Sequence, residues 1–150
     1  MPLNQQLKGK EYGEVEFAVD RNRVIQFADA VGELDSIYRD PAAAKAAGFE
    51  DQLAPPTFVT VTQIMTSGQV VVDPELGLNY SLVVHGEQEY EWRRPVKVGD
   101  KLRAVPRIAD IYARGPNEFL LIEAEIKDES GETVVVARST LLSRGTASGT

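Results

Sequence analysis

The spacing of apolar residues divides the chain into a helical first half and a second half of strands. After Asp20, the apolar residues at i, i+3, i+4 and i+7 form one helix face: Val24, Phe27, Ala28 and Val31. The carboxylate of Asp20 can accept hydrogen bonds from the first helical turn, and Gly32 suits the C-terminal cap. The pattern therefore predicts a helix over residues 21–31.

Two further stretches in the first half carry helix signals. A proline at a first-turn position and a closing glycine frame a short alanine-rich helix over residues 41–47. Residues 57–67 are ambiguous, because their β-branched side chains favour a strand. The spacing of Phe58, Val61 and Met65 favours a helix instead, as do the two preceding prolines and the following glycine. From the residues alone, both interpretations stay open.

Alternation of apolar and polar residues predicts strands, and the turn residues of 70–80 predict a loop. Tyr90 and Trp92 share one face of their strand, opposite three glutamates. The predicted strands are 12–19, 84–94, 101–112, 119–127 and 133–142. This order predicts an α+β fold in which helices cover one face of an antiparallel sheet. The other face would need cover as well, and we expect a second subunit to supply it.

Composition narrows the class of protein. At 150 residues, 43% of them hydrophobic, the chain suits one globular domain. A net charge of −7 argues against nucleic-acid binding, and the absence of cysteine removes disulfides and thiolate sites. His85 is the only histidine, so a multi-histidine metal site is excluded and no cofactor is expected. Without a run of about 18 apolar residues or an apolar leader, we expect a cytoplasmic protein with no membrane span.

Three segments resemble the MaoC-like dehydratase/hydratase family: residues 27–38, 46–58 and 84–100. The third is the most specific, with a His-Gly-acid-Gln run, an Arg-Pro pair and a Gly-Asp turn. Within that family the chain is similar to the N-terminal-type domains, such as the non-catalytic subunit of mycobacterial (3R)-hydroxyacyl-ACP dehydratase. The resemblance implies a single hot-dog domain over 1–143, its antiparallel sheet wrapped around a central helix at 57–67, and a flexible tail at 144–150.

Catalytic members of this family carry a Gly-Asp-x-Asn-Pro-x-His pattern, whose aspartate and histidine perform the acid–base chemistry. Laid on residues 32–38, the pattern places Glu33 at the aspartate and Tyr38 at the histidine. A phenol titrates near 10 and is a poor base at neutral pH. The family's His-Gly pair, whose glycine amide binds the oxyanion, reads Pro55-Pro56 here, and proline has no N–H. These exchanges argue against an independent active site.

Each candidate site residue could have a functional role or only a structural one. Glu33 is the candidate catalytic carboxylate, or only a loop acid. The candidate substrate-binding residues are Tyr38, Pro55, Pro56, Thr57 and His85. The Thr57 amide could replace the lost oxyanion donor, whereas Tyr38 could instead organise its loop. By strand alternation His85 lies on the polar face, where a structural hydrogen bond at a subunit contact is the favoured role.

Three functions follow from the resemblance. The first is a substrate-binding and stabilising subunit of a (3R)-hydroxyacyl-thioester dehydratase of fatty-acid metabolism, in which a catalytic MaoC-like partner supplies aspartate and histidine. The second is a non-catalytic homodimer that binds acyl-CoA or acyl-ACP, or is only structural. The third is a self-sufficient hydratase or thioesterase using Glu33. The basic residues between Arg93 and Arg107 could attract a carrier protein or its phosphopantetheine, or form an ordinary solvated strand face.

Overall fold

The computed structural model describes residues 1–147, in which helices and strands alternate with short 3₁₀ turns. The α-helices are α1 (Arg21–Val31), α2 (Pro41–Ala46) and α3 (Thr60–Val71). The strands are β1 (Val15–Ala18), β2 (Val83–Trp92), β3 (Lys101–Arg114), β4 (Asn117–Lys127) and β5 (Thr133–Ser143). The 3₁₀ turns are Gln5–Leu7, Ser36–Tyr38, Pro56–Val59, Pro74–Leu76 and Tyr80–Leu82.

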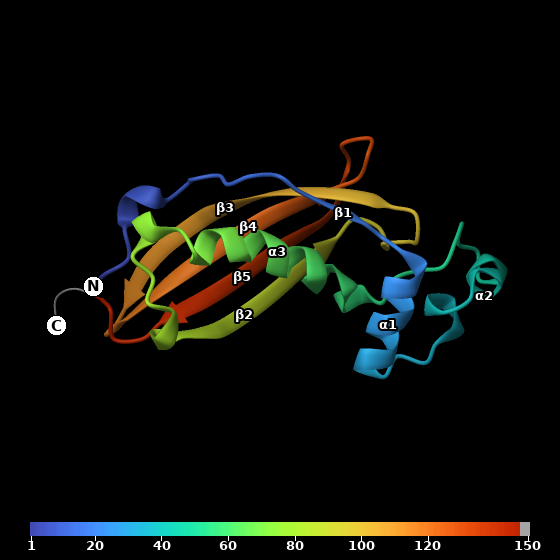
Figure 1. Ribbon diagram of the computed structural model, residues 1–150, viewed down its shortest axis with the longest axis horizontal. Coiled ribbons are helices and arrows are strands. Elements are labelled where there is room, and N and C mark those ends of the chain that lie inside the picture. The colour runs from blue at the N-terminus through green and yellow to red at the C-terminus, as the bar shows by residue number, and fades with distance from the viewer. Residues whose placement is uncertain (148–150) are drawn as a thin grey trace.

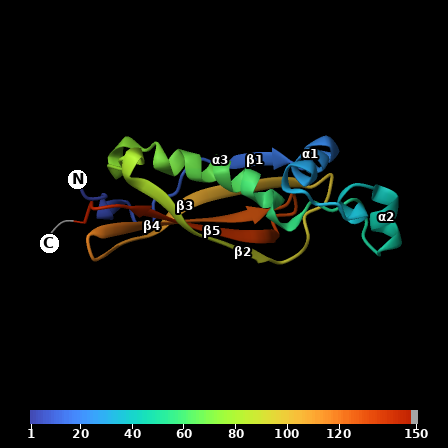
Figure 2. The same ribbon diagram turned by 90° about the horizontal axis from the view of Figure 1, so that it is seen from below.

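The strands of residues 1–147 form one antiparallel sheet in the order β1-β3-β4-β5-β2. Helix α3 runs along one face of this sheet, and α1 and α2 lie beyond one of its ends (Figure 1). Turned by 90°, the molecule shows α3 on one side of β3, β4 and β5, with the edge strand β1 near the level of the helix (Figure 2). The predicted α+β hot-dog fold, a sheet around a central helix, is therefore confirmed.

Local signals located the helices well. Helix α1 has the predicted bounds, with Asp20 accepting from the amides of Asn22 and Arg23 and Gly32 in the left-handed conformation at φ 73°. The ambiguous stretch is helical, because a 3₁₀ turn at Pro56–Val59 leads directly into α3. The helix also continues past Gly68 to Val71, further than predicted. Burial against the sheet outweighs the strand propensity of its β-branched residues.

The buried face of α3 differs from the expected one. Met65 is 43% exposed and Ile64 is 65% exposed, whereas the helix face against the sheet carries several polar side chains. The buried residues of α3 are Thr62, Gln63, Thr66 and Val70. Two of these polar side chains form hydrogen bonds within the helix, since Thr66 donates to the Gln63 carbonyl and Gln63 donates to Ser67 at 2.7 Å. Helix α3 thus presents apolar side chains to solvent.

Two apolar clusters anchor the ends of α3 to the sheet. At the N-terminal end, the ring of Phe58 lies 5.8 Å from that of Phe17 and 5.5 Å from that of Phe27. At the C-terminal end, Val70 packs among fully buried residues of β3 and β4 that include Ile108 and Leu120. The first cluster fixes the start of α3 and, with it, the Pro55-Pro56 corner.

The outer face of the sheet is charged, and its basic and acidic side chains form ion pairs with one another. Arg138 on β5 bonds Glu123 on β4 at 2.8 Å and Glu89 on β2 at 2.5 Å, and Arg107 on β3 bonds Glu123 at 2.6 Å. The hydrogen bond to Glu123 raises the pKa of Arg138 above its usual value. Because its charges are paired, this face does not need to be covered by apolar side chains. The need to cover it, which was the reason for expecting a second subunit, is therefore removed. Within residues 1–147, no strand pairs with the outer edge of β2.

The two ends of the described chain meet at one buried carboxylate. Glu118 is 2% exposed and accepts from the Leu3 amide at 2.9 Å and from the Thr146 hydroxyl at 2.8 Å. The predicted tail begins at Arg144, whose amide donates to the Leu82 carbonyl, and residues 148–150 lie outside the described part. No helix within residues 1–147 has the length and apolar character needed to cross a membrane.

Candidate functional site

An apolar cavity of about 670 Å³ lies where the loops after α1 and α2 meet the end of β2. Its wall is built from aromatic, proline and aliphatic side chains, with two arginines beside them. The lining residues are Ile37, Tyr38, Phe49, Leu53, Ala54, Pro55, Pro56, Trp92, Arg93, Arg94, Pro95 and Val96. Two other hollows, along β3 and β4 and beside the β4–β5 hairpin, are bordered mainly by charged side chains. The apolar cavity is therefore better suited than these to an apolar ligand.

A buried glutamine holds the loops that form the cavity wall. Gln52 is fully buried and donates from Nε2 to the Tyr38 carbonyl at 2.7 Å. Its side-chain oxygen accepts from Arg21 of α1 at 2.8 Å, and its own carbonyl accepts from the Val98 amide. A second backbone bond joins Ala54 to Val96 at 2.8 Å. These bonds tie α1, the Tyr38 turn and the β2–β3 loop together, and sequence analysis gave no sign of this role for Gln52.

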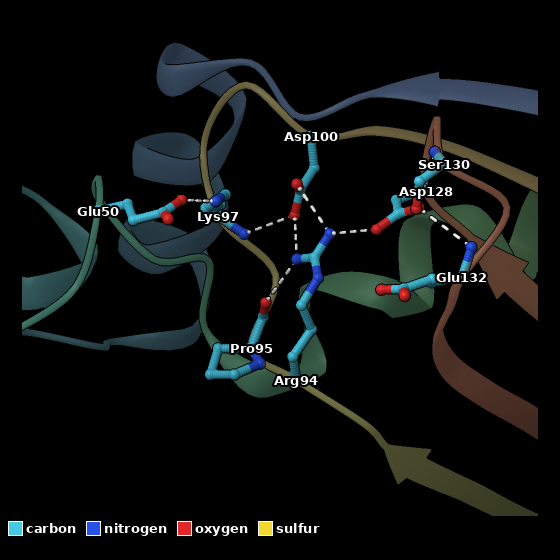
Figure 3. A network of polar contacts seen from close by, with 8 residues as sticks. All are labelled: Glu50, Arg94, Pro95, Lys97, Asp100, Asp128, Ser130 and Glu132. Atoms are coloured by element: carbon cyan, nitrogen blue, oxygen red, sulfur yellow. Dashed lines mark hydrogen bonds and ion pairs between the residues drawn. The ribbon is translucent and has the colours of Figure 1, made fainter.

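The β2–β3 loop is held from its other side by Arg94 (Figure 3). The guanidinium donates to both carboxylate oxygens of Asp100, at 2.8 and 3.1 Å, to Asp128 at 3.1 Å and to the Pro95 carbonyl at 2.9 Å. Asp100 also accepts from the Lys97 amide at 3.0 Å, and Lys97 itself pairs with Glu50. The hydrogen bond to Asp100 raises the pKa of Arg94. The wall formed by Pro95 and Val96 is thus fixed by ion pairs.

These contacts also account for the basic stretch between Arg93 and Arg107. Every lysine or arginine in it except Arg103 has an acidic partner within residues 1–147. Besides the pairs already described, Arg93 bonds Glu91 at 2.9 Å and Lys101 bonds Glu129 at 3.2 Å. Such paired charges favour the interpretation as an ordinary strand and loop surface over that of a free docking patch for a carrier protein.

The structure brings some of the sequence candidates together and leaves others apart. Tyr38, Pro55 and Pro56 line the cavity, whereas Glu33, Thr57 and His85 are not among its lining residues. The carboxylate of Glu33 accepts from the amide of Asp35 at 3.0 Å, so it caps its own loop. Burial raises the pKa of the Tyr38 phenol, and the nearby acids Glu33 and Asp35 raise it further. Tyr38 is therefore a neutral hydroxyl at physiological pH.

His85 does not lie on the face that alternation predicts. It pairs with Leu141 of β5, while Glu87 pairs with the next residue, Thr140, so Gly86 is bulged out of the register. Because paired residues share a face, His85 lies on the helix-facing side with the buried Leu141 and not with the glutamates. At Gly86 a Cβ would approach the Thr140 carbonyl oxygen to 3.2 Å, which favours glycine there. The predicted strand face of His85 is therefore wrong because of this bulge, and its role as a site residue stays a prediction.

The cavity can hold an apolar ligand but lacks acid–base groups. Its lining includes no histidine, aspartate or glutamate, and the described residues contain no group of such side chains that could hold a metal ion. Sequence analysis missed Phe49 and Trp92 as lining residues. The pairing of Trp92 with Tyr90 on one strand face was the available signal, and their rings lie 5.3 Å apart.

Comparison with known sequences gives matches over almost the whole chain. The family model described as FAS1-like, dehydratase domain region, matches residues 6–137. A UPF0336 protein of Saccharopolyspora erythraea is 47% identical over 148 residues, which cover 98% of this chain and 95% of the relative. A UPF0336 protein of Streptomyces avermitilis is 42% identical over 150 residues, with 99% and 100% covered.

Solved structures share the fold. A chain of the C-terminally truncated HadBC (3R-hydroxyacyl-ACP dehydratase) complex from Mycobacterium tuberculosis has a TM-score of 0.81 and 25% identity, covering 91% of this chain and 96% of that one. A MaoC-like dehydratase has a TM-score of 0.86 and 22% identity, covering 93% of this chain and 43% of that one. The expected resemblance is confirmed: the chain belongs to the family described as FAS1-like, dehydratase domain region, and it shares its hot-dog fold with solved dehydratases that include a MaoC-like one.

Proposed function

We propose that this chain is the acyl-binding, non-catalytic subunit of a (3R)-hydroxyacyl-thioester dehydratase of fatty-acid metabolism. The observation that carries the proposal is the cavity, which keeps an apolar wall at the family's active-site segment but has no acid–base pair in its lining. In this proposal a partner subunit supplies the aspartate and histidine. The substrate is an acyl-ACP or acyl-CoA thioester, and the cytoplasmic location remains a prediction.

The size and chemistry of the cavity support acyl binding. A volume of about 670 Å³ is in the range of small-molecule sites, and Phe49, Leu53 and Trp92 offer apolar surface. Each methylene group buried there contributes on the order of 0.8 kcal/mol before the cost of ordering the chain. A medium-length acyl chain would thus gain enough to bind without any catalytic contact. The loop-bound carboxylate of Glu33 weighs against a self-sufficient hydratase or thioesterase.

Two surfaces support the need for a partner. The outer edge of β2 is unpaired within residues 1–147, and an unpaired edge favours strand addition. Along α3 and at its C-cap, the apolar side chains of Ile64, Met65 and Val72 are exposed. The similar mycobacterial chain comes from a structure described as a HadBC complex, so a heteromer has a structural parallel. We therefore favour a MaoC-like partner over a second copy of this chain.

The test is hydration of an enoyl thioester by this chain alone and by the chain co-purified with a MaoC-like protein that retains aspartate and histidine. We expect activity only in the mixture, with Glu33→Gln in this chain leaving it unchanged. Activity of the chain alone that Glu33→Gln abolishes would overturn the proposal in favour of a self-sufficient enzyme. No activity and no stable heteromer would leave the non-catalytic homodimer.

Two matched substitutions test the cavity itself. Phe49→Asp places a carboxylate in the cavity wall, whereas Leu34→Asp places one on a side chain that is 80% exposed and outside the wall. In the active mixture, we expect Phe49→Asp to raise KM for a medium-chain enoyl thioester at least tenfold, and Leu34→Asp to leave it within twofold. Equal effects of the two substitutions would argue against acyl binding in this cavity.

A further inference from the structure

The cavity wall contains four side chains that can donate a hydrogen bond, and the two arginines among them are already paired with acids. Arg94 is bound to Asp100 and Asp128, and Arg93 is bound to Glu91 at 2.9 Å. The other two are Tyr38 and Trp92, and neither the hydroxyl nor the indole N–H makes a hydrogen bond to any group within residues 1–147. Tyr38 is thus one of two uncommitted side-chain donors in a wall that is otherwise apolar, and the one that lies in the loop resembling the family's active-site segment.

The backbone holds Tyr38 in place before any ligand arrives. Its amide donates to the Asp35 carbonyl at 3.1 Å, and its carbonyl accepts from the buried Gln52 at 2.7 Å. Asp35 also caps the 3₁₀ turn by accepting from the Ile37 amide at 3.0 Å. A side chain on such a braced turn loses little conformational entropy when it binds a ligand.

The chemistry of the phenol restricts what it can bind. Burial and the two acids of its loop raise the pKa of Tyr38, so the proton remains on oxygen at neutral pH. A neutral phenol donates to an acceptor oxygen but does not abstract a proton. The nearby corner is Pro55-Pro56, and neither residue has an amide hydrogen to offer a ligand in the same cavity. An acceptor that enters this cavity therefore finds free side-chain donors at Tyr38 and Trp92, and of the two, Tyr38 is the one on the turn braced by Gln52.

We propose that the Tyr38 hydroxyl donates a hydrogen bond to the carbonyl oxygen of a bound acyl thioester, whose hydrocarbon chain lies against the apolar wall. This inference rests on the proposed function and deepens it, because it assigns the residue that distinguishes a thioester from a ligand with only an alkyl chain. Tyr38 is thereby a ligand-binding residue that fixes the position of the thioester, and the proton transfers belong to the partner subunit.

A matched pair of ligands tests the hydrogen bond directly. S-octanoyl-pantetheine carries the carbonyl, and the S-octyl thioether of pantetheine lacks it while keeping a chain of the same length. Trp92 is the only tryptophan of the chain and lines the cavity, so its fluorescence reports occupancy. We expect the wild type to bind the thioester about 3- to 10-fold more tightly than the thioether, since one hydrogen bond is worth roughly that ratio.

Tyr38→Phe should remove this preference and leave the affinity for the thioether unchanged. Tyr112→Phe is the control, because it makes the same chemical change on a 41% exposed residue stacked on Phe119, outside the cavity. Urea unfolding of both variants checks that the fold is retained. If Tyr38→Phe still prefers the thioester, the inference is overturned. An equal loss of affinity for both ligands also overturns it, because that result would mean that Tyr38 only packs against the ligand.

The same titration separates this inference from the proposed function. Saturable binding of the thioether by the wild type supports the cavity as an acyl site whatever Tyr38 does. In that case, failure of the Tyr38→Phe prediction overturns the hydrogen bond and leaves the proposed function standing. Absence of a saturable Trp92 response to either ligand overturns both.

Discussion

Replacing Arg94 by methionine removes the guanidinium that joins the β2–β3 loop to the β4–β5 hairpin (Figure 3). Methionine keeps most of the apolar stem, so the change deletes the charge and its hydrogen bonds rather than the packing. It leaves the carboxylate of Asp100, whose side chain is only 7% exposed, with the Lys97 amide as a remaining donor. The loop that carries Pro95 and Val96 loses one of its supports.

The expected cost lies between two limits. Breaking a fully buried ion pair costs about 3–5 kcal/mol, whereas exposed pairs contribute about 0–1 kcal/mol. The Asp100 side chain is buried but that of Arg94 is 33% exposed, so solvent screens part of the interaction. We therefore expect Arg94→Met to lower the free energy of unfolding by about 2 kcal/mol, which is a fall in Tm of roughly 4–8 °C for a chain of this size.

Urea unfolding, followed by Trp92 fluorescence and by circular dichroism, measures this change. A double-mutant cycle with Asp100→Asn should give a coupling energy of about 1–2 kcal/mol. Lys101→Met is the control, because its pair with Glu129 has both side chains at least 65% exposed and should change the free energy of unfolding by less than about 0.5 kcal/mol. Additive effects of Arg94→Met and Asp100→Asn would refute the reasoning, as would equal costs at Arg94 and Lys101.

Three other predictions concern stability. Glu118→Leu leaves the Leu3 amide without its acceptor and removes one of the acceptors of the Thr146 hydroxyl, which should cost about 2–4 kcal/mol in urea unfolding. Glu118→Gln, which keeps an oxygen there, should cost less than half as much, and equal losses would contradict this. Hydrogen bonds from Ser130 and Arg94 lower the pKa of Asp128 from 3.8 to about 2, so its stabilising effect is complete above pH 4 and lost as the pH falls toward 2. The difference in urea midpoint between wild type and Asp128→Asn should therefore shrink across that range, and a constant difference would speak against it. Tyr90→Phe removes the 2.6 Å hydrogen bond to Thr60 and should lower the free energy of unfolding by about 1 kcal/mol in the same assay. An unchanged free energy of unfolding would contradict this prediction.

The helices and strands were predictable because their signals are local. Asp20 and Gly32 bound α1 through hydrogen bonds and a positive φ that depend only on neighbouring residues. Alternation likewise located β4, where inward Ile122 and Ile126 flank outward residues such as Glu123 and Glu125. Together with the family's motifs, this local information was enough to predict the hot-dog fold.

The burial of particular faces was not predictable. The apolar spacing in α3 pointed to Met65 as buried, yet the sheet lies against Thr62 and Thr66, whose hydroxyl-bearing side chains are fully buried. His85 changes face because one extra residue at Gly86 shifts the register of β2 against β5. A bulge depends on the partner strand, and a period-2 pattern therefore cannot reveal it.

The sequence by itself determined the type and order of the elements and the family, and the resemblance predicted that the family's catalytic residues are exchanged at Glu33, Tyr38 and Pro56. Only the tertiary structure decided which of these meet. It placed Tyr38 and Pro56 with Trp92 in one cavity and engaged Glu33 with its own loop. The physical reason is that the wall is assembled by long-range contacts, such as those of Gln52 and Arg94, between segments that are distant in the sequence.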